Sequence, residues 1–261
     1  MYALPELSKL KLDQFAHKFR GESIPLGTAF SYFCASMPLA EDDFKEYLEE
    51  PIAALPPVIS ALLPKIFICL VPYLEMAGAK KKTMRAGDQI VSMAKPADDR
   101  RLAVAHMPDG KQMVLAFGIK DTEMADYHYH FYRSIATLVA DLIEPEQMEQ
   151  YSQLLAAEFR AQAHGEVDES SWDLKEQLMA HGGKFKSTTK GAIEYAKQSF
   201  IDTLTLFLHG LCCDIDVEPG PRQLRTSYLR KRLQLFKTMF PPGEDYAIFP
   251  EDEKIVNDCP F

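Results

Sequence analysis

The sequence lacks several strong signatures of common active sites. It contains no GxxxxGK[ST] phosphate loop, no GxGxxG turn, no GxSxG elbow, no HExxH pair and no CxxC pair. These absences remove the usual nucleotide-binding, serine-hydrolase and zinc-protease assignments. They do not exclude an enzyme, because many active sites are assembled from residues that are distant in the sequence.

Long apolar runs and a cysteine framework are also missing. The longest apolar stretch, residues 58–74, is interrupted by Pro64 and Pro72, whereas a membrane-spanning helix needs about 20 consecutive apolar residues. Five cysteines, with Cys212 and Cys213 adjacent, form no spaced disulfide pattern. Because the first residues are also acidic and contain proline where an export signal would be basic and apolar, we expect a cytoplasmic protein.

Positive charge is in deficit. The net charge is −9 and the isoelectric point about 5.3, which disfavours nucleic acid as a partner, because a general grip on phosphates needs excess lysine and arginine. The 261 residues are 47% hydrophobic and 26% charged, the usage of an ordinary folded chain. We therefore expect one globular domain over residues 1–261.

What is present predicts a mainly α-helical, bundle-like domain with a small β element. Residues 1–77 read as short helices broken by prolines, including a core-facing helix in 58–74 that breaks at Pro64. Residues 78–120 hold strand-like runs, which predict an antiparallel hairpin or three-stranded meander around 88–118. Its most specific feature is the turn sequence Met107-Pro108-Asp109-Gly110.

The second half of the chain has helical periodicity. Apolar residues recur every three or four positions from Asp121 onward, and proline, serine and glycine mark the helix ends. This predicts a helical bundle over residues 121–240, followed by an acidic surface tail at 241–261. The expected helices begin near Asp121, Glu144, Ser170, Thr188 and Pro221.

The run Asp126-Tyr127-His128-Tyr129-His130 is the first candidate site. On a helix, His128 and His130 point about 200° apart and do not close readily on one metal ion, whereas Asp126 and His130 share a face. An imidazole and a carboxylate so placed could bind a divalent metal such as zinc. The structural alternative for His128 is a hydrogen-bonded histidine at the edge of the core.

A second candidate lies where the fourth helix ends. His209, Cys212, Cys213 and Asp214 gather imidazole, thiol and carboxylate groups at one helix terminus, with further acids beyond it. Such a set could hold a divalent cation. The alternative is an acidic surface strand that pairs with the basic fifth helix.

The polar link between the second and third helices is a third candidate. His164 could join a metal site, and Glu166 could act as a catalytic base for a metal-bound water. The alternative is structural, because Asp168 is placed to cap the following helix.

The fifth helix is basic. Four of its arginines could bind an anion or a partner: Arg222, Arg225, Arg230 and Arg232. The alternative is a solvated face that neutralises nearby acids.

Three hypotheses follow. The leading one is a binding or regulatory protein with a protein partner, because acidic and basic elements are separate and catalytic motifs are absent. The second is a metal-dependent, hydrolase-like enzyme whose site combines Asp126, His128 or His130 with His164, Glu166, His209 and Asp214. The third and weakest is a phosphate or nucleic-acid binder that uses the arginines of the fifth helix.

Overall fold

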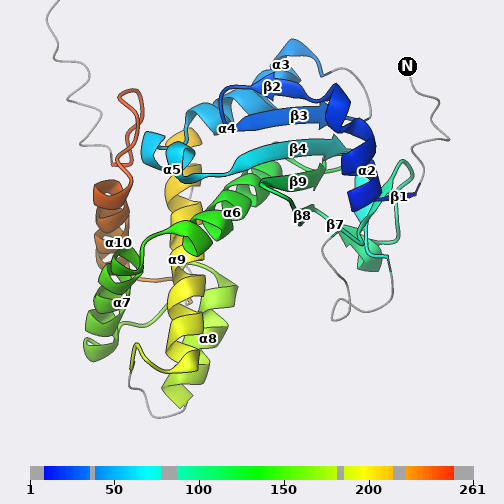
Figure 1. Ribbon diagram of the computed structural model, residues 1–261. Coiled ribbons are helices and arrows are strands. Elements are labelled where there is room, and N and C mark those ends of the chain that lie inside the picture. Colours follow the sequence, from blue (N-terminus) through cyan, green and yellow to red (C-terminus); the bar gives the residue numbers. More distant parts are fainter. Residues whose placement is uncertain (1–8, 36–38, 78–86, 181–184, 214–221, 250–261) are drawn as a thin grey trace, which may run out of the picture. The chain divides into compact units, whose positions relative to one another are not determined.

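The computed structural model describes residues 9–35, 39–77, 87–180, 185–213 and 222–249 (Figure 1). The chain divides into two compact units. Residues 1–49 and 63–134 form the first, here called the sheet unit. Residues 50–62 and 135–261 form the second, here called the helical unit. None of the described helices is long and apolar enough to cross a membrane.

A five-stranded mixed sheet organises the sheet unit, in the order β2-β3-β4-β9-β8. The three central strands are parallel and the two edge strands are antiparallel to their neighbours. Figure 1 shows β2, β3, β4 and β9 side by side. The strands are β2 (Ile24–Leu26), β3 (Phe30–Cys34), β4 (Lys65–Val71), β8 (Val104–Asp109) and β9 (Gln112–Gly118).

A second, four-stranded antiparallel sheet has the order β1-β6-β5-β7. Its strands are β1 (Leu10–Lys11), β5 (Tyr73–Glu75), β6 (Ile90–Ser92) and β7 (Arg101–Leu102). The connecting segments include η1 (Arg20–Glu22) and η4 (Asp98–Arg100), both short 3-10 helices. α2 (Leu12–Phe19) follows β1 directly.

Helices cover both faces of the five-stranded sheet. α2 buries Phe15 and Phe19 with Phe33, Phe67 and other residues of one face. The opposite face is met by the first part of α6 (Met124–Leu142), where Tyr127 contacts Phe117. It is also met by a helical stretch made of α3 (Glu41–Phe44) and the π-helical η2 (Lys45–Glu49). The sheet is therefore the centre of a three-layer arrangement, in which central strands must be apolar on both sides.

The predicted mainly α-helical class is wrong, because two sheets of four and five strands with mixed topology make the chain α/β. The decisive error lies in residues 58–74. The structure has α5 (Pro57–Leu62) and then the strands β4 and β5, not a helix that breaks at Pro64. Residues Ile66 to Val71 are each at most 2% exposed. A strand buried on both faces is apolar at every position, so it also satisfies helical spacing.

The hairpin is confirmed, but its details and its third strand differ. β8 pairs with β9 antiparallel up to Asp109 and Gln112, so the loop is Gly110-Lys111, with Gly110 at φ +63°. Pro108 lies within β8, which is tolerated because β8 is an edge strand. The predicted meander does not form, since β6 belongs to the other sheet.

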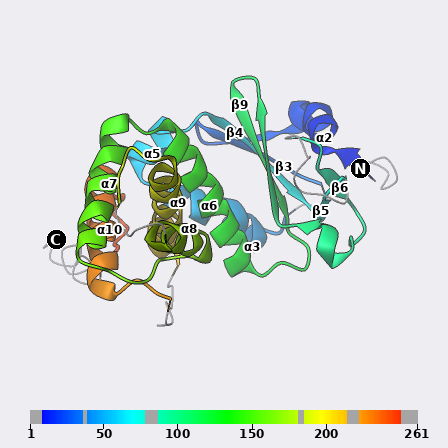
Figure 2. The same cartoon turned by 90° about the horizontal axis from the view of Figure 1, so that it is seen from below.

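The helical unit contains helices at the predicted places in the second half of the chain, although the predicted start of the last one, Pro221, lies outside the described residues. They are the later part of α6, α7 (Pro145–Arg160), α8 (Glu169–Ala180), α9 (Lys190–Cys212) and α10 (Thr226–Met239). Two short helices from earlier in the chain join them, α4 (Glu50–Ala53) and α5. Helices α7, α9 and α10 pack against one another, and α8 packs on α9 (Figure 2).

Aromatic side chains form the core between these helices. Phe236 of α10 stacks on Tyr151 of α7 at 5.3 Å between ring centroids and meets Phe200 of α9 edge-on at 4.9 Å. In the tail, Phe249 is 7% exposed and lies beneath Arg230. The rest of the predicted surface tail, residues 250–261, lies outside the described residues.

Candidate functional site

A groove of about 660 Å³ opens at one edge of the sheet unit. The side chains that line it come from β2, β3, α3 and the segments beside them. The lining residues are Glu22, Ile24, Tyr32, Phe33, Cys34, Leu39, Glu41 and Phe44. Its volume falls within the range of about 300–1,000 Å³ that is usual for ligand sites.

The pleat of the sheet explains the apolar walls. Ile24 pairs with Tyr32 across β2 and β3, so both side chains stand on the same face. Phe44 of α3 lies over Tyr32, with ring centroids 5.6 Å apart. Ile24 nevertheless remains 54% exposed, one of the largest values for an apolar side chain in the described part of the chain. The groove thus offers an apolar strip that water still reaches.

Carboxylates lie at the groove and along the helical stretch beside it. Glu22 and Glu41 line it directly, and both are exposed. Positions 41 to 49 contain five acidic residues and one lysine, which gives a local formal charge of −4 (five negative, one positive). Burial raises the pKa of the Tyr32 phenol, and the neighbouring Cys34 raises it further, so Tyr32 is neutral at pH 7. A ligand for this groove would combine apolar groups with positive charge.

The edge strand limits how a ligand can be held. β2 contains Pro25, which has no backbone N–H. An added strand would therefore find no donor at this position, and Pro is a recognised device against pairing at sheet edges. Recognition at the groove would depend on side chains.

The helical unit contains a fully buried network of charged groups. Arg232 of α10 is 0% exposed and donates to both oxygens of Glu158, at 3.0 and 2.6 Å, and of Glu166, at 2.7 and 2.9 Å. Lys175 of α8 donates to Glu166 at 3.2 Å and to the carbonyl oxygen of Gly165 at 2.8 Å. Two carboxylates and two cations give a formal sum of zero, so no net charge is buried among these four side chains.

This network makes Glu166 a poor catalytic base. Burial alone raises the pKa of Glu166, but the adjacent Arg232 and Lys175 and a hydrogen bond from the Tyr195 hydroxyl lower it to about 2. A cavity that Glu166 lines is about 60 Å³. Its carboxylate is thus committed to ion pairs that link α7, α8 and α10, and removing one partner of such a buried pair costs about 3–5 kcal/mol.

Arg232 likewise differs from the exposed anion-binding residue that the sequence suggested. The other three arginines of that group, Arg222, Arg225 and Arg230, are exposed. Arg222 lies 3.4 Å from Glu169, and the Arg230 guanidinium lies 4.5 Å from the ring centroid of Phe249. The four arginines therefore do not form one basic face.

The predicted metal ligands near the start of α6 lie in different surroundings. His128 is 5% exposed, and its Nε2 lies 2.8 Å from the carbonyl oxygen of Glu46, which is the core-edge arrangement that the structural alternative expected. Burial lowers the pKa of His130, the exposed Asp126 opposes this shift, and Arg133 adds to it. The pairing of Asp126 with His130 on a metal ion stays a prediction.

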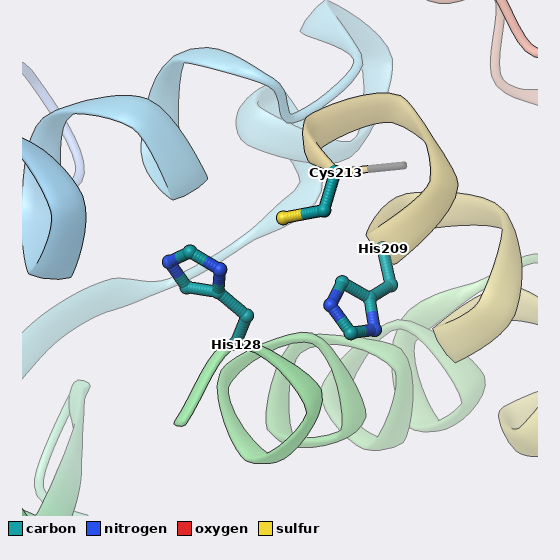
Figure 3. Close-up of side chains that lie close together, drawn as sticks. All are labelled: His128, His209 and Cys213. Carbon is teal, nitrogen blue, oxygen red and sulfur yellow. The ribbon is translucent and has the colours of Figure 1, made fainter. Parts of the chain in front are cut away.

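The remaining predicted ligands lie in the helical unit. His164 is exposed in the loop between α7 and α8. His209 is partly buried in the last turn of α9, and Cys213 caps that helix (Figure 3, which also labels His128 of α6). Asp214 lies outside the described residues.

A histidine that sequence reasoning missed lies on β8. His106 Nε2 is 2.8 Å from the Ser134 hydroxyl, which donates its own proton to the carbonyl oxygen of His130 at 2.7 Å. His106 must therefore be the donor to Ser134, and the serine, 1% exposed, is not activated as a nucleophile. Burial lowers the pKa of His106, and nearby His130 lowers it further. No local pattern signals this pair, because 28 residues separate its members.

The groove was missed for a related reason. Its residues lie in a segment that the sequence assigned to proline-broken helices, and only the strand pairing of β2 with β3 brings Ile24 beside Tyr32.

No protein-family model, curated protein or solved structure matches the chain.

Proposed function

We propose that this chain is a binding protein, and that its groove takes a basic, apolar segment of a partner protein. The observation that carries the proposal is the combination of exposed apolar walls with carboxylates at the groove and beside it. An apolar strip supplies affinity by burial, and the surrounding acids select positive charge. The cytoplasmic setting belongs to the same proposal and is supported by the cysteines within the described ranges, none of which forms a disulfide.

A peptide fits this groove better than a second copy of the chain does. The chain is acidic, with a net charge of −9, so a second copy would bring negative charge to a negative site. Pro25 offers no backbone donor, so recognition depends on side chains. These side chains suit an extended segment with alternating apolar and basic residues. The metal-dependent enzyme remains a separate prediction that the groove does not support.

The test begins with peptides selected from a random displayed library on the immobilised full chain. We expect selection to enrich peptides that join Lys or Arg to aliphatic or aromatic residues. Synthetic versions should slow alkylation of Cys34 in a chain that carries Cys212→Ser, Cys213→Ser and Cys259→Ser. Versions with Lys replaced by Glu should have no effect.

Two matched pairs of variants locate the binding. Ile24→Asp should weaken peptide binding at least about tenfold, which corresponds to about 1.4 kcal/mol, whereas Ile193→Asp, equally 54% exposed but in the helical unit, should not. Glu41→Gln should weaken it more than Asp42→Asn, since only Glu41 lines the groove. Equal affinities for the two isoleucine variants, measured by fluorescence anisotropy, would reject the proposal.

A further inference from the structure

The end of α9 places two strong metal ligands together. A ring nitrogen of His209 and Sγ of Cys213 lie within 4.8 Å of each other (Figure 3). The backbone holds this spacing, because the N–H of Cys213 donates to the carbonyl oxygen of His209 at 2.9 Å. Both side chains are partly buried, so their positions are restricted while an ion from solvent can still reach them.

The spacing and the location both favour a cation. Residues four apart on a helix project to the same side, and the two histidines of helical zinc sites use this separation. The carboxyl end of a helix carries partial negative charge, which adds to the attraction for a positive ion. α9 is 23 residues long, so its end is a fully developed helix terminus.

We propose that His209 and Cys213 are two ligands of a zinc-class metal site. Imidazole and thiolate are the ligands that zinc prefers, whereas magnesium and calcium take oxygen ligands. On binding, the Sγ–H bond breaks, its proton leaves to solvent, and the thiolate electron pair forms the bond to the metal. No electrons are transferred. This site is independent of the groove, which lies in the sheet unit.

Cobalt(II) and zinc(II) added to the metal-free full chain provide the test. Cobalt(II) should give the charge-transfer absorption of a cobalt–thiolate bond, and zinc(II) should displace it, while a large excess of calcium should not. The adjacent cysteine supplies a matched control. Cys213→Ser should abolish the thiolate band and weaken zinc binding at least about 100-fold, since even partners outside the ligand shell cost 10–100-fold. Cys212→Ser should leave both unchanged.

Histidine variants complete the assignment. His209→Ala should weaken zinc binding as strongly as Cys213→Ser, and His164→Ala, in an exposed loop, should not. Circular dichroism melts of each metal-free variant show whether it is folded. No thiolate band, or equal zinc affinities for Cys212→Ser and Cys213→Ser, would overturn the proposal.

Discussion

His106 and His130 are the side chains through which pH should act on the sheet unit. Burial lowers the pKa of each below its usual value, while Asp126 opposes and Arg133 reinforces the shift at His130. A lowered pKa means that the unfolded chain takes up protons first as the pH falls. Stability is therefore complete above about pH 7 and is lost as the pH drops below about 6.5, by at most about 1.4 kcal/mol per pH unit for each histidine.

The prediction is that His106→Gln reduces this loss. Gln keeps a donor for Ser134 but does not titrate, so the variant should lose less stability between pH 7 and 5 than the unmodified chain. Hydrogen-exchange protection of the β9 amides reports the opening of this unit. His17→Gln, at an exposed position of α2, is the control and should behave as the unmodified chain does. An unchanged pH dependence in His106→Gln would contradict the assignment.

Single residues differ in how well their roles could be predicted from the sequence. His128 could be weighed correctly as a core-edge histidine, because its position on an apolar helical stripe is a local property. Glu166 and Arg232 could not, because their pairing spans 66 residues and depends on how α10 packs. A charged residue in a basic helix is ordinarily exposed, and only the acids buried opposite Arg232 reverse that expectation.

Gly165 shows how one backbone position joins two elements of the helical unit. Residue 166 forms a parallel bridge with Gln223, through Glu166 N to Arg222 O at 2.9 Å and Leu224 N to Glu166 O at 3.1 Å. Gly165 has φ +87°, and a Cβ there would lie 2.1 Å from the Gln223 carbonyl oxygen. This contact sets the segment before α10 against the loop before α8.

Gly165→Ala should therefore lower the free energy of unfolding by about 3 kcal/mol or more, because backbone must move and the ion pairs of Glu166 move with it. Gly110→Ala is the control, since it also has a positive φ, +63°, but no atom within 4 Å of the added Cβ. It should cost about 1–2 kcal/mol. Urea unfolding measures both, and equal losses would show that conformational strain alone decides the effect.

The helices of the second half of the chain were predictable and the central strand β4 was not, for a physical reason. The starts of α7 and α9 carry Pro145 and the Thr189 cap, and such signals act within one turn. Prolines also flank β4, but the strands that pair with it, β3 and β9, lie about 35 and 45 residues away in the sequence. The register of this pairing is set only when the sheet forms. Pairing over such separations leaves no periodic trace in a strand that is buried on both sides.

The chain passes between its two units three times, at residues 49–50, 62–63 and 134–135. The first crossing falls within a continuous helical stretch and the last within α6, so neither resembles a linker. Composition could not reveal these boundaries, because linkers are recognised by glycine, proline and polar residues.

Fragments should show this interleaving. Residues 135–261 expressed alone lack residues 50–62 of the helical unit, which include α4, α5, Leu55 between them and Ile59 of α5, with Leu55 4% and Ile59 0% exposed. We expect this fragment to bind a hydrophobic dye and to melt with less cooperativity than the full chain. Joining residues 50–62 to its start through a flexible linker should restore a sharper transition. A fragment that melts as sharply without them would show that α4 and α5 are dispensable.

The same interleaving has a consequence for biosynthesis. A ribosome adds about 5–20 residues per second, so residues 50–62 are made roughly 4–15 s before residue 135. During that interval Ile59 has no partner of its own unit to shelter it. Apolar segments of the nascent chain therefore stay exposed until the segments that pack on them have been synthesised. In the cell, this is the interval in which chaperones would affect the yield of folded protein most.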